Sequence, residues 1–121
     1  MKTILIVDDL EEIRDLVEKT LRRSDRRVFT ADNARKGVEI AIAESPDLIM
    51  MDIMMPGDMD GLEATSILKE CPQTKDSKVI LLTAKGQKLD RDKGIEAGAY
   101  DYISKPFSPL ELMRKVDQIL D

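Results

Sequence analysis

The sequence contains no histidine and only one cysteine, Cys71, and these two scarcities exclude much of the usual enzyme chemistry. Without histidine the chain lacks the commonest zinc ligand and the usual general base, so any reaction of a phosphohistidine must involve another protein. A single cysteine cannot form an internal disulfide, which fits a reducing compartment, and we expect a cytoplasmic protein. Cys71 itself is expected to pack as a small side chain rather than to act as a nucleophile.

Positive charge is also in short supply, with 19 lysines and arginines against 24 aspartates and glutamates and a net charge of −5 at pH 7. Nucleic-acid phosphates and anionic lipids repel an acidic surface, so we expect no direct contact with nucleic acid or a membrane. Long apolar runs are missing as well. The amino-terminal run stops at Asp8, which favours a buried strand over a signal peptide or a membrane span.

The chain has the size and composition of one ordinary domain. Its 121 residues are 42% hydrophobic and 36% charged, and we predict a single domain over residues 1–121 with no further domain in this chain. Patterns typical of strands and helices alternate along it. The last helix has the clearest start, a capping Ser108 followed by Pro109 and Glu111. The strands are predicted at 4–7, 27–31, 48–51, 78–83 and 99–103, and the helices at 10–21, 34–42, 62–68, 84–97 and 109–119.

The helical pattern is weakest between residues 84 and 97. Only Leu89 and Ile95 are large apolar residues there, and Gly94 stands where a better helix former would stabilise by about 1 kcal/mol. We therefore expect a marginal helix, which Gly98 ends in a left-handed conformation.

Repeated alternation of strand and helix implies right-handed crossovers and a parallel sheet with helices on both faces. The first, third and fourth strands are almost purely apolar and should be central, whereas the second and fifth carry polar groups and should be edges. The sequence thus predicts an α/β fold, a doubly wound five-stranded parallel sheet in the order 2-1-3-4-5. This is the flavodoxin-like arrangement, in which ligands bind at the carboxyl ends of the strands between strands one and three.

Three aspartates fall at that point. Asp52 ends the third strand, before a loop punctuated by Pro56 and Gly61, and Asp8 and Asp9 end the first strand. Alone, Asp52 is also explained as a turn-capping residue, and one of the other pair is expected to cap the following helix. Together the three repel, by about 4 kcal/mol per close pair at an effective dielectric near 20. A hard cation that prefers oxygen ligands, Mg²⁺ above all, would neutralise them.

Two further polar residues end the neighbouring strands. Thr83 follows the fourth strand and Lys105 the fifth, so a hydroxyl and an ammonium group lie where they could hold the oxygens of a transferred phosphoryl group. A strand-end threonine and a solvated lysine are common without such a role, and it is their combination with the three acids that favours phosphoryl chemistry.

In their order and spacing, these residues resemble the response-regulator receiver domains of two-component signalling, including the stand-alone chemotaxis regulator of that family. The resemblance covers essentially the whole chain. It is carried by Ile-Val-Asp8-Asp9, Met-Met-Asp52-Ile-Met-Met-Pro56, Leu-Leu-Thr83-Ala84, Glu-Ala97-Gly98-Ala99-Tyr-Asp-Tyr102 and Ser-Lys105-Pro106-Phe107.

The resemblance implies that Asp52 accepts a phosphoryl group from a histidine kinase or phosphotransfer protein. It implies Mg²⁺, or Mn²⁺ as a substitute, and no turnover of small molecules. The implied ligands of the metal are Asp8, Asp9, Asp52 and the backbone carbonyl of Met54, with Asp8 in an assisting role. The implied contacts of the phosphoryl group are Thr83, Ala84 and Lys105, with Tyr102 as the switch partner of Thr83 and a cis peptide between Lys105 and Pro106.

Phosphorylation adds close to two negative charges and would draw Thr83 and Lys105 toward them. The weakly patterned stretch 84–97 is the natural segment to move, with a coupling of roughly 1–3 kcal/mol sufficient for signalling. We expect 84–97, the fifth strand and the last helix to form the face that binds a downstream protein, with the chain a monomer or a phosphorylation-dependent dimer.

Three alternatives remain open from the sequence. A hydrolase with an aspartyl-phosphate intermediate would need an acid two residues after the nucleophile, where this chain has Met54. A flavodoxin-type cofactor carrier would need a glycine-, serine- or threonine-rich phosphate loop where this chain has the acidic run after Asp8. The third is a receiver that forms the input domain of a longer regulator. The loop from Pro56 to Gly61 is also one residue longer than usual in the family, which bears on how a kinase would dock.

Overall fold

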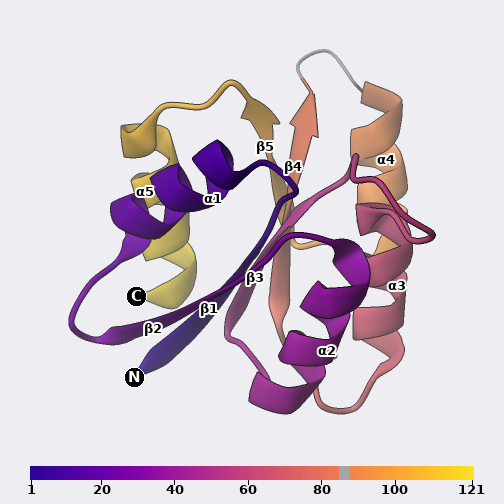
Figure 1. Cartoon of the computed structure of the whole chain (residues 1–121), viewed down its shortest axis with the longest axis horizontal. Coiled ribbons are helices and arrows are strands. Elements are labelled where there is room, and N and C mark those ends of the chain that lie inside the picture. Colours follow the sequence, from indigo (N-terminus) through magenta and orange to yellow (C-terminus); the bar gives the residue numbers. More distant parts are fainter. Residues whose placement is uncertain (85–87) are drawn as a thin grey trace.

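A computed structural model describes residues 1–84 and 88–121, apart from the side chains of residues 84 and 88–91. Its five strands pair in parallel in the order β2-β1-β3-β4-β5, with helices on both faces (Figure 1). This confirms the predicted fold class and strand order. The strands are β1 (Lys2–Val7), β2 (Arg26–Ala31), β3 (Leu48–Asp52), β4 (Lys78–Ala84) and β5 (Asp101–Lys105). The helices are α1 (Glu11–Leu21), α2 (Ala34–Glu44), α3 (Gly61–Glu70), α4 (Lys88–Ala97) and α5 (Pro109–Leu120).

The apolar strands β1 and β3 lie inside the sheet, and their side chains contribute to two hydrophobic cores, one on each face. Successive side chains point to opposite faces, so Leu5 and Val7 join the core under α2 and α3, whereas Ile4 and Ile6 join the core under α1 and α5. All four are fully buried, and each contributes on the order of 1.5–3 kcal/mol. Figure 1 shows α1 and α5 on one face and α2, α3 and α4 on the other. The continuous apolar runs thus reflect strands covered on both sides.

The fifth strand begins later than its sequence pattern predicts, at Asp101 rather than at residue 99. Gly98 has a φ of 106°, as expected for a residue that ends a helix with positive φ. The N–H of Ala99 donates to the carbonyl of Gly94 (3.0 Å). Residues 99 and 100, which the pattern places in the strand, therefore belong to the turn after α4. The strand extends instead to Lys105, which places that side chain at its carboxyl end.

The prediction of a helix over 84–97 is correct only from Lys88 onward, because residue 84 ends β4 and 85–87 lie outside the described residues, as does the side chain of Leu89. Gly94 also has a packing role that its low helix propensity does not indicate. A Cβ at Gly94 would overlap Cδ1 of Leu81, so the glycine lets α4 pack directly on β4. The glycine therefore costs helix propensity and at the same time permits close packing.

Side-chain caps begin several of the helices. Ser108 Oγ accepts the N–H of Glu111 at 3.1 Å, as predicted, and Asp60 accepts the N–H of Glu63 at 2.9 Å in front of α3. Before α1 the expectation fails, because Asp8 Oδ1 accepts the N–H of Leu10 (2.9 Å) and closes a turn instead of capping the helix. No helix in the described part of the chain is long and apolar enough to cross a membrane.

Candidate functional site: an acidic cluster at the strand ends

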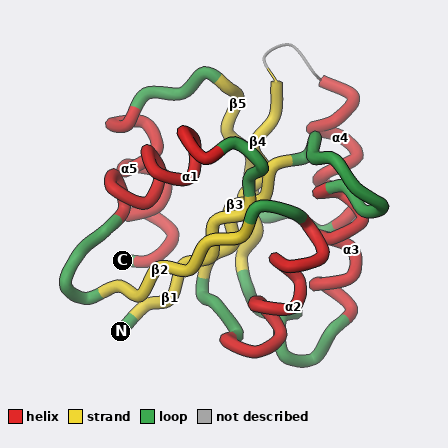
Figure 2. The backbone as a smooth tube through the Cα atoms, in the orientation of Figure 1, coloured by secondary structure: helices red, strands yellow, loops and turns green. Residues whose placement is uncertain are grey.

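Three carboxylates meet at the carboxyl ends of the two central strands. Asp8 and Asp9 directly follow β1, Asp52 is the last residue of β3, and one oxygen of each lies within 4.8 Å of the others. The sheet order brings them together, because β1 and β3 are neighbours that pair Val7 with Met51. The loops after β1 and β3, green in Figure 2, both start from this edge of the sheet.

A lysine from a distant part of the sequence lies beside these acids. Lys105 Nζ is 2.8 Å from Asp8 Oδ2 and 3.4 Å from Asp52 Oδ2. Asp8 is fully buried and Asp52 is 5% exposed, so solvent screens these charges weakly. Burial lowers the pKa of Lys105, but the hydrogen bond to Asp8 and the charge of Asp52 outweigh it and raise that pKa above its ordinary value. Lys105 therefore carries a full positive charge at neutral pH.

The carboxyl group of Asp52 has a pKa well above the ordinary value for an aspartate. Burial, followed by the charge of Asp8, raises the pKa of Asp52 from 3.8 to about 6, although Lys105 and the backbone of Met54 oppose the rise. Near pH 7 the group is mostly ionised but destabilised by its surroundings. It is therefore a carboxylate held in an environment that favours neutralisation, by a proton, a cation or a covalent bond.

This pKa gives a stability prediction for the metal-free protein. The raised folded-state pKa means that protonated Asp52 favours folding, a contribution complete below pH 3.8 and lost as the pH rises through about 6. In a chelating buffer at pH 7.5, Asp52→Asn should stabilise by about 1–2 kcal/mol after allowance for screening. Near pH 3.5 the two proteins should be equally stable. Urea unfolding at both pH values measures this, and a destabilised variant at pH 7.5 would contradict it.

Backbone and side-chain donors hold the acids in place. Asp52 Oδ1 accepts the N–H of Met54 at 3.3 Å, two residues along the chain. Arg14 Nη1 donates to the backbone carbonyl of Asp8 at 2.7 Å and so ties α1 to the end of β1. The sequence gives no signal for the role of Arg14, because a contact between a helix and the preceding strand end has no fixed spacing.

Gly61 allows α3 to approach the end of β3 closely, a role that the sequence pattern does not predict. It begins α3, and a Cβ there would lie 2.8 Å from the Cα of Ile53 and 2.9 Å from the carbonyl carbon of Asp52. Its N–H donates to the carbonyl of Ile53 at 3.0 Å. The sequence pattern predicts only a loop break at this glycine. The available signal is a capping aspartate, Asp60, followed at once by glycine, which indicates a helix start that approaches other backbone closely.

The remaining predicted site residues end the outer strands. Thr83 is buried near the end of β4, in register with Ser104, and the two hydroxyls are 3.5 Å apart. Ala84 pairs with Lys105, and its side chain lies outside the described residues. Tyr102 is in register with Leu81 and is half-buried. Leu81 and Thr83 are two residues apart on β4 and therefore point to the same face of the sheet. Tyr102 is in register with Leu81, so Tyr102 and Thr83 both lie on the face covered by α4.

Two features connect this edge with the last helix. Lys115 of α5 donates to the carbonyl of Tyr102 at 3.2 Å, pairs with Asp101 at 3.0 Å and lies 5.9 Å from the centre of the Tyr102 ring. The peptide bond between Lys105 and Pro106 is cis, as the resemblance implies. The polypeptide around Tyr102 is therefore attached to both β4 and α5.

The donor set fits a hard divalent cation. Three carboxylates supply oxygen, the chain has no histidine, and Cys71 is not among the clustered groups. Such ligands suit Mg²⁺ or Mn²⁺ better than zinc or copper. Asp9 and Asp52 have oxygens available for an ion, while Asp8 already engages Leu10 and Lys105 through its two oxygens.

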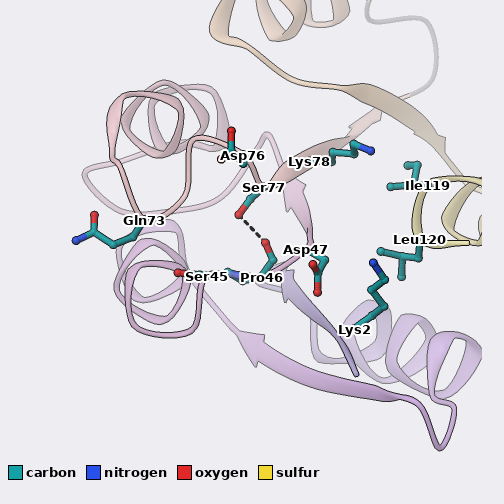
Figure 3. A pocket seen from close by; sticks show the side chains of 10 residues that line it. All are labelled: Lys2, Ser45, Pro46, Asp47, Gln73, Asp76, Ser77, Lys78, Ile119 and Leu120. Carbon is teal, nitrogen blue, oxygen red and sulfur yellow. Dashed lines mark hydrogen bonds between the residues drawn. The ribbon is translucent and has the colours of Figure 1, made fainter.

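A hollow of about 340 Å³ lies at the opposite edge of the sheet, where the strands begin (Figure 3). Its polar groups serve the fold: Ser77 Oγ donates to the carbonyl of Pro46 at 2.6 Å, and Asp47 accepts the N–H of Thr3 at 2.8 Å. Lys2 and Lys78 also line it but are exposed. The acidic cluster at the carboxyl edge is therefore the candidate functional site.

The chain is similar to known proteins over nearly its whole length. The family model of the response regulator receiver domain matches residues 4–117. The chain is 40% identical over 119 residues to the phosphate regulon transcriptional regulatory protein PhoB of Pseudomonas aeruginosa, covering 98% of this chain and 52% of that protein. For the transcriptional regulatory protein SrrA of Staphylococcus aureus the identity is 41% over 117 residues, covering 97% and 47%. The chain thus spans about half the length of these relatives. The structure of the Vibrio cholerae chemotaxis protein CheY4 matches with a TM-score of 0.90, 30% identity and 99% of each chain covered.

Proposed function

The chain belongs to the response regulator receiver domain family of two-component systems, and on this premise we propose that Asp52 is its phosphoacceptor. The observation that carries the proposal is the position of the Asp52 carboxylate. It is buried and mostly ionised near pH 7, and the ammonium group of Lys105 bridges it to a second acid, Asp8. The family is a signalling family, so the expected product is a modified protein rather than a released small molecule.

The reaction is a phosphoryl transfer from a phosphohistidine of another protein. An oxygen of Asp52 forms the new bond to phosphorus, the bond from phosphorus to the imidazole nitrogen breaks, and its electron pair leaves with the donor imidazole. Because these 121 residues contain no histidine, the donor histidine must lie outside them, in a histidine kinase or phosphotransfer domain. In this reaction the chain mainly positions the nucleophile and stabilises charge.

The residues around Asp52 have distinct tasks. The Met54 N–H fixes one carboxylate oxygen and leaves the other directed at Lys105. Lys105 stabilises negative charge on the phosphoryl oxygens, and the Thr83 hydroxyl and the backbone at Ala84 offer further donors. A divalent cation held by Asp9, Asp52 and the Met54 carbonyl would offset the charge that accumulates between the acids and the phosphoryl group.

Signalling follows from the altered charge at the same edge. Once Asp52 is phosphorylated, Lys105 gains a stronger anionic partner and Thr83 can donate to it. The consequence spreads through β5, because Tyr102 is attached to α5 by Lys115. The face formed by α4, β5 and α5 is the proposed contact for a downstream protein, through a population shift between two arrangements.

The length of the relatives bears on the biological setting. PhoB and SrrA are named transcriptional regulators and are about twice as long as this chain. We propose that this domain acts as a phosphorylation-controlled input, by dimerisation or by contact with a separate target. The acidic charge of the chain opposes direct contact with nucleic acid.

The test is to locate the phosphoryl group on the unmodified protein. The chain is incubated with acetyl phosphate and Mg²⁺, its intact mass is measured, and the modified residue is identified by borohydride reduction and peptide mapping. One adduct per chain on Asp52, absent when Mg²⁺ is chelated, is expected. An adduct on Asp9 or no adduct at all would overturn the assignment, and continuous release of phosphate from small phosphoesters would favour a hydrolase.

A further inference from the structure

An apolar groove lies outside the acidic cluster, between the β3–α3 loop and helices α3 and α4. It consists of two adjoining hollows, of about 480 Å³ at the loop and about 370 Å³ farther along the helices. Both are lined by Leu62 of α3 and Lys93 of α4, so the two hollows are direct neighbours. Figure 2 shows the β3–α3 loop in green beside α4. Each hollow has the size that a protein needs to accept side chains or a small ligand.

The loop end of the groove is rich in methionine. Met54, Met55 and Pro56 line it together with Leu62, and the side chain of Met54 is 70% exposed. Met55 and Leu62 are half-buried and pack against the core, so the groove has an anchored apolar floor beside the exposed Met54. Flexible, polarisable thioethers suit surfaces that adapt to a partner's apolar side chains.

The described residues of the rim are mostly acidic. Among the lining side chains that the structure describes, Asp60, Glu63 and Glu96 are acidic and Lys93 is the one base. Glu63 and Glu96 are both exposed, on α3 and α4 respectively, so they flank the apolar floor from opposite sides. The net charge of −5 for the whole chain adds to the local negative potential.

From this combination we propose that the groove binds a basic amphipathic helix of a partner protein. The apolar stripe of the helix, with anchors three or four residues apart, fits the floor formed by the loop methionines and Leu62. Lysine or arginine on either side of the stripe then faces Glu63 and Glu96. A second copy of this chain is disfavoured, because it would bring two acidic rims together, and an anionic membrane is repelled for the same reason.

The groove is distinct from the proposed signalling face but is joined to the phosphoacceptor. On α4 it uses Lys93, Glu96 and Ala97, which share the side of the helix that faces α3. At the loop end it includes Met54, whose N–H binds the Asp52 carboxylate. A helix bound here therefore contacts the loop next to Asp52. Because binding and phosphorylation would both affect this loop, phosphorylation of Asp52 would change the affinity for the helix.

The experiment uses a synthetic peptide as the probe, and it requires no phosphorylation. A leucine–lysine amphipathic helix of about 14 residues, close to four turns, is titrated into the ¹⁵N-labelled chain, and amide shifts and Kd are measured by NMR. A leucine–glutamate peptide of the same pattern is the charge-reversed control. We expect the largest shifts within residues 53–66 and 92–97, and no binding of the leucine–glutamate peptide.

Paired variants separate the groove from the general charge of the protein. Glu63→Gln with Glu96→Gln removes two rim charges, whereas Glu39→Gln with Glu70→Gln removes two exposed charges outside the groove. All four residues are exposed, so both variants should fold. The rim variant should weaken binding about three- to tenfold relative to the matched control.

Four results would overturn the proposal. They are no binding of the leucine–lysine peptide, shifts centred elsewhere on the protein, equal loss of affinity in the two double variants, and comparable binding of the leucine–glutamate peptide. Groove amides that shift with protein concentration alone would instead identify a second copy of this chain as the occupant and would equally refute a basic helix.

Discussion

Asp52→Asn is expected to abolish the phosphoryl adduct completely, the largest effect of any single substitution in this chain. The substitution replaces the carboxylate oxygen that would attack phosphorus by an amide, which is a poor nucleophile at neutral pH. Wild-type and variant proteins are incubated with acetyl phosphate and Mg²⁺ and compared by intact mass. The adduct should be present on the first and absent from the second.

The loss can be attributed to chemistry because the variant should remain folded. Asparagine has nearly the shape of aspartate, and its carbonyl oxygen can still accept the N–H of Met54. The substitution also removes a buried charge whose pKa is raised to about 6, so the metal-free variant should be at least as stable as the wild type at neutral pH. Circular dichroism and urea unfolding verify this on the same samples.

Asp9→Asn is the matched control, since it removes one acid of the cluster and leaves the proposed acceptor in place. It should retain the capacity for an adduct but require much more Mg²⁺ to form it, on the order of tenfold or more for a lost metal ligand. If Asp52→Asn still acquires one phosphoryl group, the acceptor has been assigned wrongly. If Asp9→Asn forms the adduct at the same Mg²⁺ concentration as the wild type, Asp9 is not a metal ligand.

The fold could be predicted largely because the clearest pattern in the sequence, its short apolar runs, can be recognised from a few neighbouring residues. The apolar runs before Asp8 and Asp52 are too short for helices and too continuous for half-exposed strands, so they indicate central parallel strands. Once those two strands are neighbours, their ends must share an edge of the sheet. The cluster of three acids therefore follows from strand order and needs no knowledge of side-chain geometry.

What the sequence did not reveal depends on contacts between distant segments. Gly94 was interpreted as a weak point of a helix, whereas the structure shows that it admits Leu81 of β4. Arg14 supports Asp8, and Ser104 lies beside Thr83, only because the fold brings them there. Propensities describe a residue in its own element, so they carry no information about such approaches.

The structure shows where the site residues lie, whereas their chemical roles are proposed. That Lys105 lies near Asp8 and Asp52 is visible in the structure, and the raised pKa of Asp52 has a physical cause. The proposed role of Asp52 as phosphoacceptor rests on the resemblance of the motifs to the receiver family, which no distance in the structure supplies. The geometry supports it because an ionised, buried carboxylate beside a cation is suited to the reaction.

Gly61→Ala is expected to destabilise the protein by about 3 kcal/mol or more, a large effect for the addition of one methyl group. The new Cβ would overlap the carbonyl oxygen of Asp52 and would lie 2.8 Å from the Cα of Ile53. Both obstacles are backbone atoms of the β3 end, which cannot rotate away as a side chain can. Relief requires α3 or the end of β3 to move, and the second of these displaces Asp52.

The matched control is Gly94→Ala, the same chemical change inside another helix. There the added Cβ meets only Cδ1 of Leu81, the tip of a flexible side chain, and alanine favours helix by about 1 kcal/mol over glycine. Its net effect should remain within about 1 kcal/mol, whereas Gly61→Ala should lower the melting temperature by roughly 10 °C or more. Because the Gly61 clash acts through the Asp52 backbone, the variant should also take up less phosphoryl group at a temperature where it is still folded. Equal melting temperatures for the two variants would show that α3 can retreat from the strand end without cost, and the close packing of α3 on β3 would then not be what positions the acceptor.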